Sequence, residues 1–361
     1  MQKKNKQVSV LTILSIISSL YGLLLIASAT YSTGSLTNVI VQSAAIVIGI
    51  TLMLVLKALD YEILIELSKI IFVIYNALLI LVLVIGTGRA ETGTNGWISL
   101  GPVNIQPSEF AKIGFIITFG AHLYSVGANI NKIKNLALLM LHLCIPLGLI
   151  LLQPDYGTAM VFIFIAIIMM FMAGVKLRYF IIAGGAFLAS TPFIWMFLDE
   201  FQKNRILVFL NPELSPTGAG YNVIQSKLAV GAGQMFGKGL FKGTQIQMDF
   251  LPGKHTDFIF AVAGEELGFF GCILVIALLC TIIFILIKNA AEVKKNAGGY
   301  ILSGIAAMLI FQCFENIGRS IGIMPVTGIP LPFFSYGGSS VLTTFISMGV
   351  ALSILKRKDY I

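Results

Sequence analysis

The amino-acid sequence predicts an all-α polytopic membrane protein with about ten transmembrane helices. Hydrophobic residues make up 57% of the chain and charged residues only 11%, against roughly 45–50% and about 25% in soluble domains. At about 20 apolar residues per crossing, a chain of 361 residues has room for these helices and one large loop. The composition therefore excludes a soluble globular protein.

The predicted spans follow one another along the whole chain, which we interpret as a single integral membrane domain over residues 1–361. Their approximate bounds are 8–29, 36–56, 66–86, 108–126, 135–152, 157–175, 179–197, 267–288, 299–318 and 339–355. The first apolar run is longer than the roughly 7–15 residues of a signal-peptide core, so we expect a retained helix. The cysteines lie in apolar runs without metal-type spacing, which predicts free thiols.

The distribution of basic residues predicts the topology. Lys and Arg cluster in the loops on one side of the predicted helices, whereas the short loops of the other side hold only Arg89 and Arg319. By the positive-inside rule both termini are cytoplasmic, and residues 198–266, between the seventh and eighth helices, form a large extracellular loop. The net charge of +8 is thereby explained as membrane anchoring, and we expect no nucleic-acid partner.

Charged residues within or beside the predicted helices are candidates for a site. Glu109 and Lys112 lie three residues apart inside the fourth helix, on one face of it. Ionisable groups in a span usually face a cavity or pathway, but a mutually neutralising structural pair explains them equally well. Asp155 precedes the sixth helix, and it either caps that helix or contributes to a site.

The stretch 240–271 places acids and bases among aromatic and glycine residues in a chain that otherwise avoids charge. Asp257 is its central residue, and His255 is a second candidate base. Partial desolvation at the membrane surface would favour proton transfer by such groups. The alternative is that Asp257 caps a helix beginning at Phe258 and that His255 makes ordinary loop hydrogen bonds.

Two glycine-containing segments also stand out, one overlapping the start of this stretch and one much later in the chain. Residues 231–243 fail the phosphate-loop pattern, because Ala232 and Gly239 replace the required residues and no strand precedes them. Lys238 there is a candidate contact for an anionic headgroup, and an adaptable loop is the alternative. The prolines and glycines between Gly322 and Gly338 exclude a regular helix, so that segment must be buried in protein or line a wet cavity.

Several long motifs resemble the SEDS family (shape, elongation, division and sporulation), polytopic proteins that include RodA and FtsW. They are WISLG from Trp97, QPSEFAKI from Gln106, QPDYGTA from Gln153, NPELSPTGAGYNVIQSKLAVGAGQMFGKGL, FLPGKHTDFIFAVAGEELGF and NIGRSIGIMPVTGIPLPFFSYGGSS. The resemblance covers the chain end to end. Its two departures are Gly96, where many relatives have arginine, and Arg319, where methionine is common.

The resemblance implies a peptidoglycan glycosyltransferase of the bacterial cytoplasmic membrane. Such a protein polymerises lipid II at the outer face and works with a class B penicillin-binding protein that crosslinks the strands. Asp257 matches the family's essential aspartate. The expected substrate contacts, several of which match polar positions of the family's central cavity, are Glu109, Lys112, Asp155, Arg205, Trp97, Lys238 and His255.

In the expected reaction Asp257 accepts the proton of the acceptor 4-hydroxyl, which attacks the anomeric carbon of a lipid-linked donor with inversion. Arg205 and Lys112 are the candidates for stabilising the leaving pyrophosphate. A divalent cation, magnesium or manganese, would do the same, but no ligand cluster marks a site for it.

Two other functions fit a bundle of this kind. A lipid II flippase needs a path to both membrane faces, whereas the suggestive loops here cluster on the exterior, which favours the transferase. A noncatalytic scaffold of the cell-wall machinery leaves the residues around Asp257 unexplained. The short termini favour a RodA-like role in elongation over an FtsW-like role in division.

Overall fold

The protein is built almost entirely of helices, as the sequence predicts. A computed structural model describes residues 2–88, 94–100, 103–197, 203, 207–216, 218–293 and 296–357. Within these residues eight helices are long and apolar enough to cross a membrane. They are α1 (Gln2–Ala29), α2 (Thr37–Ala58), α4 (Ser68–Ile85), α6 (Pro107–Val126), α7 (Ile133–Leu151), α13 (Ile259–Glu292), α14 (Ala297–Ser320) and α15 (Gly338–Arg357).

Two further apolar helices, α8 (Tyr156–Met172) and α9 (Leu177–Phe197), coincide with the sixth and seventh predicted spans. Each predicted span therefore corresponds to a helix, while the total of about ten crossings stays a prediction. The smaller elements are α3 (Tyr61–Glu66), α11 (Ala219–Ala232), α12 (Thr244–Gln247), and an antiparallel hairpin of β1 (Ile98–Leu100) and β2 (Val103–Ile105). Short 3-10 turns lie at Tyr31–Thr33, Gly127–Asn129 and Pro212–Leu214.

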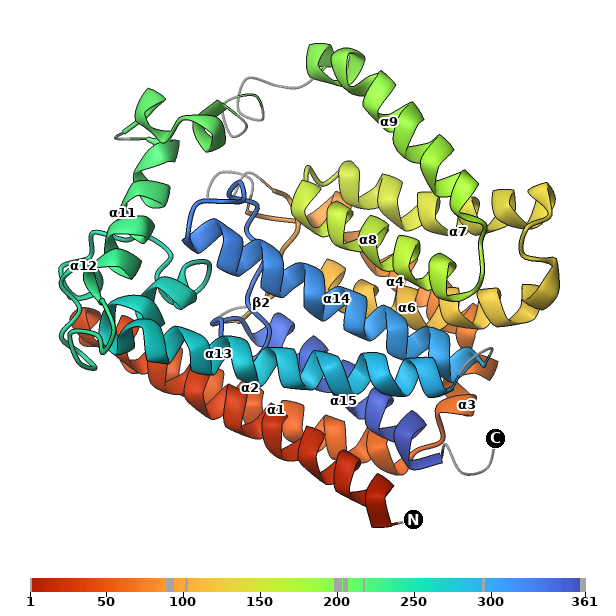
Figure 1. The fold of residues 1–361 in the computed structure, drawn as a ribbon, viewed down its shortest axis with the longest axis horizontal. Helices are drawn as coiled ribbons and strands as arrows, with labels where there is room; N and C mark the ends of the chain where they lie inside the picture. Colours follow the sequence, from red (N-terminus) through yellow and green to blue (C-terminus); the bar gives the residue numbers. More distant parts are fainter. Residues whose placement is uncertain are drawn as a thin grey trace.

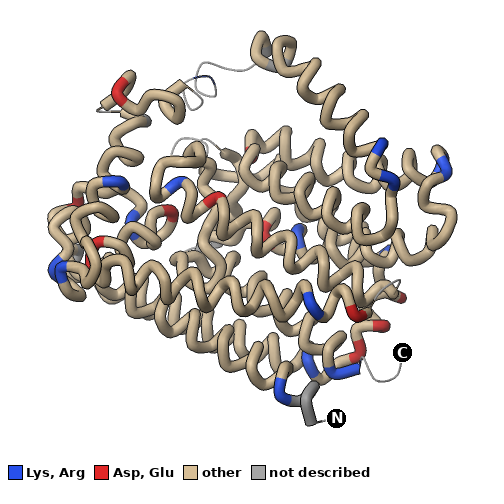
Figure 2. Tube along the Cα trace, viewed as in Figure 1, with Lys and Arg blue, Asp and Glu red and all other residues tan. Residues whose placement is uncertain are grey.

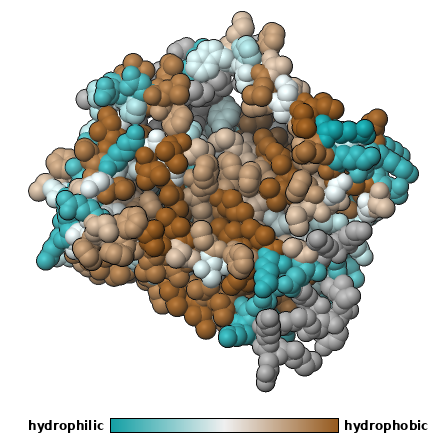
Figure 3. Space-filling view, viewed as in Figure 1, coloured by the Kyte–Doolittle hydropathy of each residue, from teal (hydrophilic) through white to brown (hydrophobic). Residues whose placement is uncertain are grey.

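The long helices run lengthwise through the molecule, and α9 lies apart from them at the top of the view (Figure 1). Both chain termini lie at one end of the bundle, here called the inner end. The opposite end, which holds α11 and α12, is called the outer end. Charged residues gather at these two ends (Figure 2), and a largely apolar surface covers the face between them (Figure 3). This distribution is that of a protein with a bilayer around its middle.

The centre of the bundle is formed by α14 and α15. In their most apolar windows 83% and 78% of the residues are buried, against 22–61% in the other spanning helices. A Cβ at Gly349 of α15 would lie only 3.0 Å from the backbone of Met53 in α2. Small residues permit such close approach where helices pack in lipid. The central helix α14 packs against α6, α8, α13 and α15, so its position in the bundle is fixed on several sides.

The helix α13 is broken at Gly268, whose φ of 67° and ψ of −158° are not helical. The two N–H groups that follow the break donate to the carbonyls of Gln234 and Met235. The glycine-rich segment 231–243 thereby replaces helical hydrogen bonds that the break removes. The predicted eighth span matches only the part of α13 after the break, because residues 259–267 are already helical within the segment predicted as a large loop.

Candidate functional site

Asp257 lies in the loop that leads into α13. This helix begins at Ile259, and its N-cap position is Phe258, which makes no side-chain capping bond. The alternative prediction that Asp257 caps the helix is therefore wrong. The side chain of Asp257 is 33% exposed, so its carboxyl group is accessible from solvent while its backbone is buried in contacts.

The residues before Asp257 are fixed by the proline-rich loop, residues 321–337. The carbonyl oxygen of His255 accepts a hydrogen bond from the backbone N–H of Tyr336 at 2.9 Å, and that of Thr256 accepts one from the hydroxyl of Ser335 at 2.6 Å. The proline-rich loop has no regular helix, and several of its apolar side chains are buried, among them Phe333 and Phe334. The prediction of an irregular segment is confirmed, and of its residues, 329 and 331–335 are buried in protein, whereas Ile321 and Ile323 are exposed.

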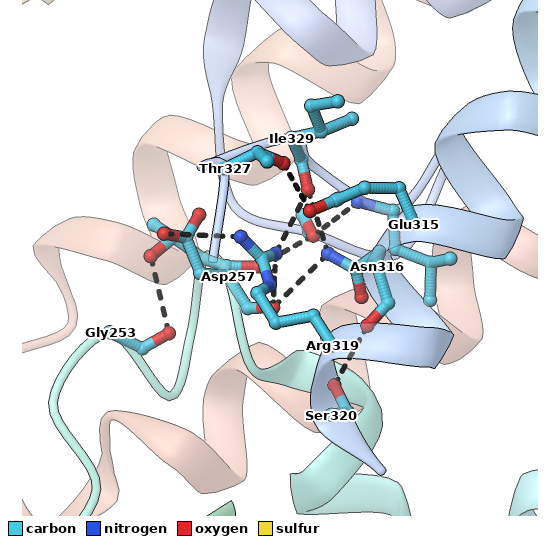
Figure 4. A network of polar contacts seen from close by, with 11 residues as sticks. Gly253, Asp257, Glu315, Asn316, Arg319, Ser320, Thr327 and Ile329 are labelled. Atoms are coloured by element: carbon cyan, nitrogen blue, oxygen red, sulfur yellow. Dashed lines mark hydrogen bonds and ion pairs between the residues drawn. The ribbon is translucent and has the colours of Figure 1, made fainter. Parts of the chain in front are cut away.

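The carbonyl oxygen of Asp257 is held by α14. It accepts hydrogen bonds from Arg319 Nη2 at 2.7 Å and from Asn316 Nδ2 at 3.1 Å. The same two nitrogens donate to the carbonyl of Ile329 in the proline-rich loop, at 3.0 and 2.9 Å (Figure 4). One turn of α14 therefore ties the Asp257 loop to the proline-rich loop.

The buried guanidinium of Arg319 lies beside the partly exposed carboxylate of Asp257. Arg319 is 0% exposed, and its Nη1 lies 3.7 Å from Oδ2 of Asp257. Its guanidinium carbon lies 5.3 Å from the centre of the Phe258 ring. One helical turn earlier, the buried Glu315 accepts a hydrogen bond from the hydroxyl of Thr327. The charge of Arg319 attracts the carboxylate of Asp257.

His255 is the second candidate base of the sequence analysis. Burial, reinforced by the neighbouring Lys254 ammonium, lowers the pKa of His255 below its ordinary value. The imidazole is therefore neutral at physiological pH and able to accept a proton. Lys254 itself is 4% exposed. Its ammonium lies 2.7 Å from the carboxylate of Asp249 and donates to the carbonyl of Ile246 at 2.5 Å, and these contacts stabilise the loop.

Asp155 caps α8 by accepting a hydrogen bond from a backbone N–H of the first turn at 3.0 Å, which confirms the capping interpretation. It also accepts one from the side-chain amide of Gln106 at 3.3 Å. The start of α8 touches the proline-rich loop, since a Cβ at Gly157 would lie 2.7 Å from the carbonyl oxygen of Thr327. Trp97 directly precedes β1 and forms an isolated β-bridge with Thr87. A Cβ at the preceding Gly96 would lie 3.8 Å from Nε2 of Gln106.

Glu109 and Lys112 form the predicted ion pair, with Oε1 and Nζ 2.6 Å apart. Both residues are buried, at 3% and 1% exposure, near the start of α6. The hydrogen bonds and ion pairs of the described residues do not connect this pair to Asp257. Its part in substrate binding stays a prediction.

Lys238 donates to Oε1 of Glu265 at 2.7 Å. That carboxylate is completely buried, and it also accepts the backbone N–H groups of Gln245 and Ile246 at 2.9 and 3.1 Å. The adjacent Glu266 is equally buried, and its carboxylate accepts hydrogen bonds from two side chains. The glycine-rich segment 231–243 is thus anchored on α13, and the ammonium of Lys238 is already paired.

Arg205 lies outside the described residues. In the part of the chain that the structure describes, no group of three or more His, Cys, Asp or Glu residues could hold a metal ion. The divalent cation therefore stays a prediction. The four cysteines are free thiols, as the sequence predicts.

Sequence reasoning missed Glu315 and Asn316, and it used Arg319 only as a topology signal and noted it as a departure from a motif. The available signal was the spacing of Glu315 and Arg319, which lie four residues apart on one face of an otherwise apolar helix. The site's other partners could not be found in this way, because Asp257 and Arg319 are 62 residues apart in the chain.

A cleft of about 650 Å³ lies between α4, α6 and α7, away from these residues. Its wall includes His122 and His142, whose Nδ1 atoms are 3.1 Å apart. The candidate residues predicted from the sequence do not line this cleft.

Comparison with known proteins gives consistent matches over most of the chain. The family model of the FtsW, RodA and SpoVE cell cycle proteins matches residues 7–360. The peptidoglycan glycosyltransferase MrdB of Escherichia coli is 37% identical over 278 residues, which cover 77% of this chain and 75% of MrdB. Stage V sporulation protein E of Bacillus subtilis is 36% identical over 315 residues, which cover 87% of this chain and 85% of that protein.

Solved structures show the same fold. A chain from a peptidoglycan synthase complex, described as coordinating polymerization and crosslinking, is 30% identical with a TM-score of 0.84, over 96% of this chain and 97% of that one. The rod shape determining protein RodA of Thermus thermophilus is 29% identical with a TM-score of 0.72, over 96% of each chain. The present chain is therefore a multi-pass membrane protein that belongs to the FtsW/RodA/SpoVE family.

Proposed function

We propose that this protein is a peptidoglycan glycosyltransferase that polymerises lipid II into β-1,4 glycan strands at the outer face of the cytoplasmic membrane. The observation that carries the proposal is the environment of Asp257, whose carboxylate is exposed while its carbonyl is fixed by two side chains of α14. A general base must be accessible to its substrate and held in place. The names of similar proteins, including MrdB, state this activity.

In the proposed mechanism, Asp257 accepts the proton of the 4-hydroxyl of the acceptor N-acetylglucosamine. The oxygen then attacks the anomeric carbon of the lipid-linked donor, and the bond from that carbon to the pyrophosphate oxygen breaks. Undecaprenyl pyrophosphate leaves with the bonding electrons. Because the α-linked donor becomes a β-linked product, a base on the attacking side suffices and no covalent intermediate is required.

The leaving pyrophosphate requires positive charge, for which Lys112 and Arg205 are our candidates. Lys112 is bound to Glu109, so a pyrophosphate would compete with that carboxylate for the ammonium. A divalent cation that arrives with the pyrophosphate would supply charge without a protein cluster of its own. We also propose Asp155, Trp97, Lys238 and His255 as contacts for the sugar and headgroup parts of the substrate.

We propose a class B penicillin-binding protein as the partner, because a similar chain was solved in a synthase complex that couples polymerization to crosslinking. We further propose a role in elongation and cell shape. The similarity to the rod shape determining protein RodA supports this proposal.

The test is polymerisation of labelled lipid II by the purified protein, alone and with its penicillin-binding partner, in the presence of a divalent cation. We expect glycan polymer from the wild type and a loss of about 10²- to 10⁴-fold in Asp257→Ala. The matched control is Asp60→Ala, because Asp60 caps α3 near the inner end. This control should polymerise at the wild-type rate.

Two results would reject the proposal. Equal polymerisation by Asp257→Ala and the wild type would remove Asp257 from the reaction. Absence of polymer under every condition, together with lipid II scrambling in proteoliposomes, would identify a flippase, and absence of both activities would favour a scaffold.

A further inference from the structure

We propose that Arg319 is a positioning residue that orients the carboxylate of Asp257 for proton transfer. This inference rests on the proposed function. Arg319 does not touch substrate, because it is completely buried. It acts through Asp257, whose Oδ2 lies 3.7 Å from its Nη1. Figure 4 shows the guanidinium directed from α14 toward Asp257.

The first argument is the cost of burying this side chain. A buried charge is strongly unfavourable unless it is paired and hydrogen-bonded. Yet among the described residues Nε and Nη1 of Arg319 have no hydrogen-bond partner, and neither has Oε2 of the nearby Glu315. Nη2 donates to the carbonyls of Asp257 and Ile329. A merely structural arginine at this position would be expected to use its remaining donors.

The second argument is that Asn316 duplicates the structural part of the contact. Asn316 Nδ2 donates to the same two carbonyls, those of Asp257 and Ile329. The two loops would therefore remain joined to α14 without Arg319. What Arg319 alone supplies is a positive charge beside the exposed carboxylate of Asp257.

The third argument concerns the freedom of that carboxylate. It is 33% exposed, and an aspartate at a surface can rotate among several side-chain conformers. A guanidinium fixed by the last turn of α14 selects the conformers that direct one oxygen toward it. The position of the other oxygen is then restricted as well. Because a misplacement of about 1 Å in a reacting group can cost about 10²-fold in rate, this selection affects catalysis directly.

The experiment compares kcat and KM for lipid II polymerisation in Arg319→Met and the wild type. Methionine removes the charge and the hydrogen bonds while filling much of the volume. We expect kcat to fall about 10- to 100-fold with KM unchanged, since the side chain does not contact substrate. The matched control is Arg357→Met, because Arg357 pairs with Asp60 away from the site. It should keep kcat within about twofold.

A double variant tests whether Arg319 acts through Asp257. If it does, Asp257→Ala combined with Arg319→Met should be no slower than Asp257→Ala alone, because effects on one functional unit do not add. Additive losses would overturn the inference. So would a wild-type kcat in Arg319→Met, or a raised KM with unchanged kcat.

If Arg319→Met does not fold, Arg319→Lys decides the question. Lysine keeps the charge, but its single ammonium lacks the fork that serves a carbonyl and a carboxylate together. We expect this variant to be folded and slowed at unchanged KM, and a wild-type kcat would overturn the inference. Absence of polymer from the wild type would instead refute the proposed function, and this inference with it.

Discussion

The buried carboxylate of Glu265 should be essential for the stability of the outer end, and its removal gives a prediction with a definite size. In Glu265→Ala the backbone N–H groups of Gln245 and Ile246 and the ammonium of Lys238 lose their common acceptor. Hydrogen bonds to charged groups contribute about 1.5–3 kcal/mol each. Lys238 is 31% exposed, so water replaces part of its contribution. We expect a loss of about 3 kcal/mol, mostly from the two N–H groups.

The assay is thermal unfolding of the purified protein in detergent, with proteolysis of residues 238–247 as a local readout. At about 2–4 °C per kcal/mol, Glu265→Ala should lower Tm by about 6–12 °C and expose this segment to protease. Glu213→Ala is the control, since Glu213 is an exposed glutamate of the same predicted loop and should change Tm by about 1 °C or less. A Tm for Glu265→Ala as high as that of the control would show that this carboxylate does not stabilise the outer end.

Three further predictions concern stability. Replacing either member of the Glu109–Lys112 pair should lower the free energy of unfolding by about 3–5 kcal/mol, because it leaves one buried charge unpaired. The double variant Glu109→Met with Lys112→Met should lose less than the two single losses combined. A double-mutant cycle of unfolding measures this difference. Gly237→Ala should destabilise the protein by about 1–3 kcal/mol, because Gly237 has a φ of 78° and a Cβ there would lie 2.1 Å from a carbonyl oxygen. The control Gly231→Ala should not lower Tm, because there is open space around Gly231. The pKa of His255 is lowered in the folded protein, so below the unfolded pKa of about 6.5 the unfolded state binds more protons and the folded state loses stability. Between about pH 7.5 and pH 5, Tm should therefore fall more in the wild type than in His255→Gln.

Each of these predictions has a contrary outcome. Additive losses in the Glu109–Lys112 cycle would show that the two charges do not compensate each other. Equal melting temperatures of the two glycine variants would contradict the close contact at Gly237. A pH dependence that His255→Gln leaves unchanged would show that another group titrates.

The sequence was sufficient for the helices, because a span in lipid must be a long apolar run and each such run became a helix. It was insufficient for the break in α13. Residues 259–266 contain Glu265 and Glu266 at their end, and the predicted eighth span therefore began only at residue 267. The structure instead buries both glutamates against the glycine-rich segment, and hydropathy cannot reveal such a tertiary partner.

Only part of the candidate site could be predicted, because tertiary contacts also decide which residues form it. Asp257 and His255 were found because charge is conspicuous in an apolar chain, and Glu109 with Lys112 because helical spacing makes them neighbours. Arg319 was counted only as a topology signal. Its contact with Asp257 depends on how α14 packs against a loop that is distant in sequence, and local periodicity carries no information about such packing.

The central claim, that Asp257 is the general base, is tested most directly by the single-turnover rate of glycosyl transfer in Asp257→Asn. Asparagine keeps the size of the side chain and the backbone bonds to α14, but it cannot take up the proton. We expect a rate lower by about 10²- to 10⁴-fold, with lipid II affinity and Tm unchanged. A transfer rate within a few-fold of the wild type in a folded, lipid II-binding Asp257→Asn would contradict it.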